Sequence, residues 1–306
     1  MSRRVFDCFP FGTELDVLRL RLELLDPVVD RFVIVEAPTT FSGQAKPLHY
    51  AEHRDELAAY ADKVVHVVVD DMPPPPASGD RWPAERFQRD AIGRGLVDAD
   101  PDDLVLVSDV DELIDPDVVA GPLQQVDEPV ALEMRLAYWR GNWELADGWD
   151  RARACAARHV GYPQQLRASD PRWAVRDAGA HLTYLTDVEG VRRKLAGFSH
   201  DEFDNDTFRD PDYLAICLQI AAMPVNGRPL TVRAPDDLSA VQRFALDRRP
   251  DLFDFEVPTL GRRRSAIDAY LRFRQRRRLP DRVRRSLDVV VRRALESSSR
   301  RPTTQP

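Results

Sequence analysis

Cysteine and long apolar runs are both scarce in this chain of 306 residues. The three cysteines, Cys8, Cys155 and Cys217, are too few and too scattered for a disulfide framework or a cysteine-based zinc site. The longest stretch without a charged residue, Tyr213 to Gly227, has 15 residues, whereas a membrane-spanning helix needs about 20 apolar ones. The sequence therefore predicts buried thiols in a reducing compartment and no spanning helix.

Three further features are not found in the sequence. No apolar segment of signal-peptide type follows Met1, because a strand-like pattern already begins at Val5. We therefore expect a cytoplasmic protein. No glycine-rich Walker loop is present, which argues against an ATPase, and no internal repeat points to a solenoid.

The composition, 43% apolar and 31% charged, is that of a globular protein rather than a disordered one. The net charge is −7, yet the stretch from Arg262 to Arg301 holds 15 arginines against four acidic residues. We divide the chain into a body, residues 1–261, and an arginine-rich C-terminal segment, residues 262–306. An acidic body argues against nucleic acid as a partner.

Strand and helix patterns alternate over the first 135 residues. Continuous apolar runs predict buried strands, and leucines at helical spacing predict the intervening helices. This alternation indicates βαβ units. We therefore expect an α/β fold with a Rossmann-like, mostly parallel sheet flanked by helices. The strands are predicted at 5–9, 32–35, 64–69, 104–107 and 130–136, and the helices at 14–25, 51–61, 84–96 and 211–222.

The C-terminal segment carries an amphipathic helical pattern over residues 281–296. Val283 and Leu287 lie on its apolar face, and arginines cover the opposite face. Such a helix can contact an anionic membrane surface. Because the apolar stripe is mostly valine and alanine without aromatics, the sequence favours a helix docked on the body, with its arginines in solvent.

Three acidic residues follow the predicted strand at 104–107 within the segment Ser108 to Glu112. Ligands of open parallel sheets bind beyond the carboxyl ends of the strands. If the chain turns there, Asp109 and Asp111 can converge on one Mg²⁺ or Mn²⁺ ion, which would bridge to a diphosphate. An acidic surface turn is the alternative interpretation.

These acids belong to a series of sequence blocks that resembles glycosyltransferase family 17. The resemblance extends over roughly residues 3 to 230, and ordered agreement of this kind is more specific than one motif. The blocks are Glu14 to Glu23, Val28 to Glu36, Thr40 to Gly43, Lys46 to Leu48, Asp70 to Pro73, Trp82, Gln88 to Ile92, Asp103 to Glu112, Ala178 to His181 and Lys194 to His200.

The resemblance implies an inverting glycosyltransferase of the GT-A type that uses a nucleotide sugar. It implies Mn²⁺ or Mg²⁺ at Asp109 and Asp111 and a UDP-sugar donor, with UDP-GlcNAc the first expectation. The acceptor would be a hydroxyl of a glycan or glycoconjugate, and a lipid-linked sugar would suit a cytosolic protein with a basic tail.

Other roles follow from the same resemblance and stay open between alternatives. His181 is a candidate third metal ligand, or else a structural histidine, and His200 competes with it. Glu202 is the first candidate for the base that takes the acceptor proton, and Asp201 is the second, although either could be a solvated loop acid.

Three charged residues in the first half are candidate donor contacts. Glu36 ends a strand where it could bind a ribose or base. Arg89 could pair with diphosphate oxygens or form a salt bridge. Glu14 could contact the donor or simply begin a helix favourably. Four tryptophans could stack on sugars but are more often part of a core: Trp82, Trp139, Trp143 and Trp149.

The chain also departs from the family pattern. The motif continues as Leu113-Ile114 with proline delayed to Pro116, and Ala180 replaces a tryptophan before His181. Two other functions remain open. One is a phosphohydrolase with Asp109 as nucleophile and Asp111 as acid. The other is a non-catalytic protein that binds sugar nucleotides.

Overall fold

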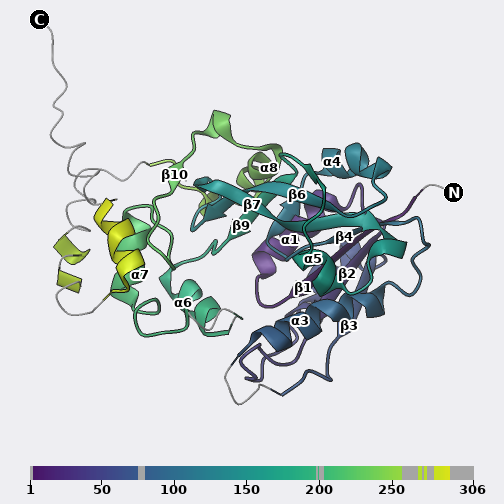
Figure 1. Cartoon of the computed structure of the whole chain (residues 1–306), viewed down its shortest axis with the longest axis horizontal. Helices are drawn as coiled ribbons and strands as arrows, with labels where there is room; N and C mark the ends of the chain where they lie inside the picture. Colours follow the sequence, from purple (N-terminus) through teal and green to yellow (C-terminus); the bar gives the residue numbers. More distant parts are fainter. Residues whose placement is uncertain are drawn as a thin grey trace, which may run out of the picture.

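The computed structural model describes residues 3–74, 80–197, 199, 203–256, 268–270, 272–273 and 279–289. One sheet of ten strands runs through the body (Figure 1). Its order is β3-β2-β1-β4-β7-β6-β9-β5, with β10 added to β7 and β8 added to β6. The α/β class is therefore confirmed.

The first four strands form the predicted parallel half of the sheet. They are β1 (Val5–Phe11), β2 (Arg31–Glu36), β3 (Val64–Val68) and β4 (Leu104–Val107). β1 pairs in parallel with β2 on one side and with β4 on the other, and β2 pairs in parallel with β3. Strand order reverses at β1, so the switch point lies between β1 and β4, where open sheets bind ligands.

The helices between these strands differ from the prediction in their length. α1 (Leu15–Leu25) is as expected, but the helix expected at 51–61 is split into α2 (His49–Glu52) and the 3₁₀ helix η1 (Arg54–Tyr60). The helix expected at 84–96 is α3 (Trp82–Asp90) followed by η2 (Ala91–Gly95). Gly95 approaches the sheet so closely that a Cβ would lie 2.3 Å from Val33 Cγ1. This close approach accompanies the tighter 3₁₀ turn.

The second half of the sheet contains both antiparallel and parallel pairs, so the expectation of a mostly parallel sheet is not confirmed. β6 (Val130–Tyr138) and β7 (Trp143–Ala156) form a hairpin with a short connection, which requires antiparallel strands. β7 then pairs antiparallel with β4. The sheet is mixed, and its remaining strands are β5 (Glu112–Ile114), β8 (Trp173–Val175), β9 (Gly179–Thr183) and β10 (Thr231–Val232).

Two apolar layers cover the sheet, as the alternation of side chains along β4 shows. Leu104 and Leu106 face the layer that contains α1 and α8 (Ala240–Arg248). Val105 and Val107 face the layer of η2 and α5 (Pro163–Ala168). The remaining short helices are α4 (Pro116–Ala120), η3 (Pro122–Gln125), η4 (Ala157–His159), η6 (Pro235–Asp237) and η7 (Pro250–Leu252).

A further apolar cluster packs around the helices that lie at one end of the molecule in Figure 1. It joins α6 (Val188–Gly197) and α7 (Pro211–Gln219) to the described part of the C-terminal segment. Val283 and Leu287 are buried there, so the described part of the predicted helix at 281–296 is docked on the body. Among the described residues, no helix combines the length and the apolar character that crossing a bilayer requires.

We predict that Gly179→Ala destabilises the fold. Gly179 has a φ of 153°, and a Cβ there would lie 2.0 Å from the carbonyl oxygen of Leu113 on the paired strand β5. Because backbone atoms must shift, we expect a loss of roughly 2–4 kcal/mol in the free energy of unfolding, measured in urea. Gly93→Ala is the control, since a Cβ there meets nothing within 4 Å. Equal stability of the two variants would contradict the prediction.

Candidate active site

The acidic loop lies where β4 ends, at the switch point of the sheet. It contains Ser108 to Asp111 and leads directly into β5. The backbone N–H of Glu112 donates to the carbonyl of Asp109, and the Glu112 carboxylate accepts the N–H of Asp109 at 2.9 Å. The loop is therefore a closed turn that presents the side chains of Asp109 and Asp111 at the carboxyl edge of the parallel strands.

Asp109 is bound by two arginines. Its Oδ1 accepts from Arg89 Nη2 at 2.8 Å, and its Oδ2 accepts from Arg167 Nη2 at 2.5 Å. Burial disfavours the charged carboxylate, but Arg167 and Arg89 outweigh this effect and lower the pKa of Asp109. Its side chain is still 30% exposed. Asp109 is thus an ionised, accessible carboxylate.

Asp111 lies deeper and has a different pair of partners. Its Oδ1 lies 3.1 Å from His181 Nε2 on β9, and its Oδ2 lies 3.0 Å from Lys194 Nζ on α6. Burial opposes ionisation here too, yet Lys194 and His181 hold the pKa of Asp111 well below 3.8. Lys194 also lies 3.2 Å from Glu14 Oε1.

The cluster carries more negative than positive charge. Five carboxylates meet three arginine and lysine side chains, so the carboxylates outnumber the permanent cations. Such an excess of oxygen ligands suits a divalent cation. The carboxylates are Glu14, Glu85, Asp109, Asp111 and Glu112, and the cations are Arg89, Arg167 and Lys194.

Arg21 on α1 is buried and fixes the acidic loop through hydrogen bonds. It pairs with Asp7 on β1 through two hydrogen bonds, of 2.7 and 2.5 Å, and neither side chain is exposed. Its Nη1 donates to the carbonyl oxygens of Asp109 and Glu112 at 2.7 and 2.9 Å, and its Nη2 donates to Ser108 Oγ. One guanidinium therefore joins α1, β1 and the loop.

A family model for glycosyltransferase family 17 matches residues 1–224, which is most of the chain. The chain belongs to glycosyltransferase family 17. It is also similar to β-1,4-mannosyl-glycoprotein 4-β-N-acetylglucosaminyltransferases, with 32% identity to the rat and human proteins and 31% to the mouse protein. Each match covers 154 residues, 47% of this chain and 28% of the relative.

The structure of this family 17 chain brings several predicted residues together. Asp109, Asp111, His181, Arg89 and Glu14 all belong to the cluster. Among the described residues, however, the ligand atoms of Asp109, Asp111 and His181 are not gathered as a ready set of three. His181 Nδ1 is buried and has no hydrogen-bond partner in the part of the chain that the structure describes.

Glu36 lies apart from this cluster. It is fully buried, and its oxygens accept from the backbone N–H of Tyr50 at 3.3 Å. His66 Nε2 lies 3.2 Å away and Lys46 Nζ 3.6 Å away. These contacts support the first turn of α2. Any contact with a ribose or base would have to compete with them.

The candidate bases Glu202 and Asp201, and His200, lie outside the described residues. Of the tryptophans, Trp139 and Trp143 are buried in a core. Trp82 begins α3. Trp149 contacts the cluster, because its Nε1 donates to Glu112 and its ring lies 4.6 Å from that of His181.

The sequence analysis gave no role to three residues of the site: Arg167 and Lys194 of the cluster, and Arg21, which supports the acidic loop. Arg167 comes from α5, a helix not predicted, and pairs with Asp109 and Glu112 across more than 50 residues. The sequence does distinguish Lys194 in one respect, because it is one of only three lysines among 44 basic residues.

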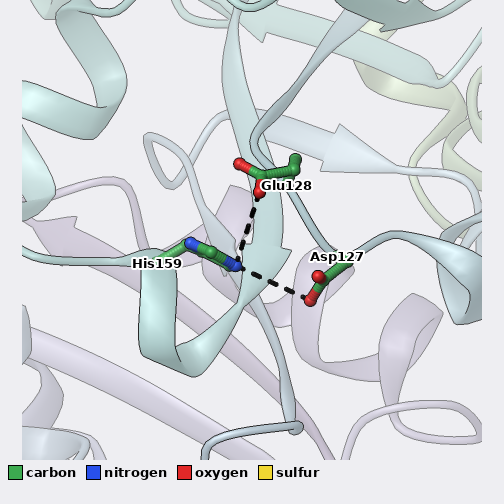
Figure 2. A group of neighbouring side chains, drawn as sticks. All are labelled: Asp127, Glu128 and His159. Carbon is green, nitrogen blue, oxygen red and sulfur yellow. Dashed lines mark ion pairs between the residues drawn. The ribbon is translucent and has the colours of Figure 1, made fainter.

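Asp127, Glu128 and His159 form a different charged group, shown in Figure 2. Their ligand atoms lie within 4.8 Å of one another. The group lies near the opposite end of β4, where Leu104 pairs with Ala156. Asp127 and Glu128 are exposed, and Asp127 already pairs with Arg158. We interpret the group as surface ion pairs.

We predict that Arg21→Met is strongly destabilising, because it leaves Asp7 charged and buried without a partner. Breaking a buried pair in this way costs roughly 3–5 kcal/mol, measurable by urea unfolding. Arg19→Met on the same helix is the control, since Arg19 is 43% exposed and we expect a change within about 0.5 kcal/mol. A loss for Arg21→Met no larger than that of the control would show that the pair is not structurally important.

Proposed function

We propose that this protein transfers a sugar from a nucleotide-sugar donor to a hydroxyl of a glycan or glycoconjugate. We take UDP-GlcNAc as the donor because the similar proteins are named as N-acetylglucosaminyltransferases. The observation that carries the proposal is the pair Asp109 and Asp111 at the carboxyl end of β4, in a chain that belongs to glycosyltransferase family 17.

The residues of the cluster fit a divalent cation in charge and in donor type. Asp109 and Asp111 would hold Mn²⁺ or Mg²⁺ through carboxylate oxygens, and His181, whose Nε2 lies 3.1 Å from Asp111 Oδ1, is a candidate for a third contact. When bound, the ion would neutralise negative charge on the departing nucleoside diphosphate.

The chain's own cations supply a second source of positive charge. Arg89, Arg167 and Lys194 now neutralise the two aspartates. Each could instead donate to diphosphate oxygens, as charge-assisted hydrogen bonds to phosphate are favourable. We propose that these side chains position the donor and stabilise its leaving group.

The acceptor hydroxyl would attack the anomeric carbon from the face opposite the diphosphate, with inversion. A carboxylate must take the hydroxyl proton as the new bond forms. Glu202 remains our first proposal for this base and Asp201 the second. A lipid-linked sugar stays among the proposed acceptors, although the apolar face of the described part of the C-terminal helix packs on the body.

Two other functions predict different behaviour in one assay series. A phosphohydrolase that used Asp109 as nucleophile would cleave simple phosphate esters. The pairing of Asp109 with two guanidiniums lowers its nucleophilicity and disfavours that function. A non-catalytic binding protein would bind nucleotide sugars without turnover. A transferase should slowly hydrolyse one donor sugar in the presence of Mn²⁺.

We predict that Asp111→Asn abolishes turnover of UDP-GlcNAc while the protein remains folded. The amide keeps the size of the side chain but removes the charge that binds a cation. Donor hydrolysis with Mn²⁺, followed by chromatography of free GlcNAc, measures the effect, and circular dichroism checks the fold. Asp127→Asn is the control for general loss of an acidic residue. Full activity of Asp111→Asn would exclude the proposed metal site.

A second prediction concerns Lys194→Met, which removes one proposed diphosphate contact. Loss of a hydrogen bond to a charged group costs roughly 1.5–3 kcal/mol, so we expect kcat/KM for the donor to fall by about 10- to 100-fold. Lys63→Met is the matched control, because Lys63 pairs with Asp26 on the surface. Unchanged kcat/KM in Lys194→Met would exclude its role.

A further inference from the structure

A cavity separate from the acidic cluster lies at the carboxyl ends of β2 and β3. It has a volume of about 230 Å³. The loop after β2 contributes Pro38, Thr40 and Phe41, and the segment after β3 contributes Asp70 and Met72. Ala84 of α3 completes one wall. Because β2, β3 and β4 are parallel, this cavity opens at the same edge of the sheet as Asp109 and Asp111.

The lining combines an apolar slot with few polar groups, as small-molecule sites usually do. Proline, phenylalanine, methionine and alanine form most of the wall. Asp71 is paired twice with Arg94, at 2.8 and 2.9 Å. The neighbouring Asp70 carboxylate, by contrast, has no hydrogen bond or ion pair with any residue that the structure describes. The lining of one cavity therefore contains both Asp70, an acceptor unpaired among the described residues, and an aromatic ring, Phe41.

The loop after β2 is held in shape by its own hydrogen bonds. Thr40 N–H donates to the Gln44 carbonyl at 2.8 Å, and Gly43 N–H donates to the Thr40 carbonyl at 2.9 Å. Thr40 Oγ1 also accepts the N–H of Gln44 at 3.1 Å. A preformed wall binds a ligand with a smaller entropy cost than a loop that must first be ordered.

The distance to the acidic cluster suits one extended ligand. β2 and β4 both neighbour β1, so two strand spacings separate them, roughly 10 Å in total. A ribose and its phosphates can span a gap of that order. α6, which carries Lys194, ends beside the cavity, since a Cβ on Gly197 would lie 3.9 Å from Thr40 Cγ2.

From these observations we infer that the cavity binds the nucleobase of the donor, with Phe41 stacking on the base and Asp70 accepting a base N–H. This inference rests on the proposed function, because it places the diphosphate of the same ligand at Asp109, Asp111 and Lys194. It assigns specificity for the nucleotide to the segments after β2 and β3, which are distinct from the residues proposed for sugar transfer.

Calorimetric titration of the full chain with UDP and with pyrophosphate, both with Mn²⁺, tests the assignment. Stacking of a base on an aromatic side chain is lost in Phe41→Ala, so UDP binding should weaken by roughly 5- to 100-fold. Pyrophosphate binding should not change, because that ligand has no base. Trp173→Ala, which removes an exposed aromatic residue on β8, is the control.

Asp70→Asn provides a second variant that keeps the shape of the cavity. It should weaken UDP binding about tenfold and change the order of preference among UDP, GDP and ADP, while Asp71→Asn should not. If UDP binds equally well to wild type, Phe41→Ala and Asp70→Asn, the nucleobase site is wrong but the proposed function stands. If Phe41→Ala weakens the binding of pyrophosphate as much as that of UDP, the assignment of the nucleobase to this cavity is also wrong. If wild type binds no nucleoside diphosphate, both proposals fail.

Discussion

The buried pair of Arg21 and Asp7 is the interaction on which the rest of the site depends. Asp7 on β1 accepts hydrogen bonds from the Arg21 guanidinium and fixes its position. The Nη1 group of the same guanidinium donates to the backbone carbonyls of Asp109 and Glu112 in and next to the acidic loop. A buried charge is costly unless it is paired and fully hydrogen-bonded. The remaining hydrogen bonds of Arg21 hold the segment that carries Asp109 and Asp111, so stability and site geometry are coupled.

The cluster above this pair is built from opposite charges on distant elements. α3 contributes Arg89, α5 contributes Arg167, α6 contributes Lys194 and β9 contributes His181. Each of these side chains contacts one of the two aspartates. The two halves of the sheet, one parallel and one mixed, therefore meet at the acidic loop, and ligand binding there would exchange internal ion pairs for contacts with phosphate.

The parallel half of the fold could be predicted from the sequence because its signals are local. Continuous apolar runs marked β2 and β4, and acids after such a run marked Asp109 and Asp111. In the mixed half, the strand predicted at 130–136 is β6, but β7 and β9 were not predicted, since they interrupt their apolar residues with charged and small ones. Arg21 and Lys194 reach the loop from residues more than 80 positions away, and ion pairs over such separations have no periodicity in the sequence.

The segment that matches the family model ends before the residues that complete the apolar cluster around α6 and α7. The match ends at residue 224, but Tyr270, Phe273 and Leu287 are buried in the cluster that supports α6 and α7. Leu287 lies so close to Gly227 that a Cβ there would be 2.6 Å from its Cγ. A shortened version that kept only the matched segment would expose this apolar surface beneath the helix that carries Lys194. Expression designs for crystallography should therefore retain the chain at least through Leu287.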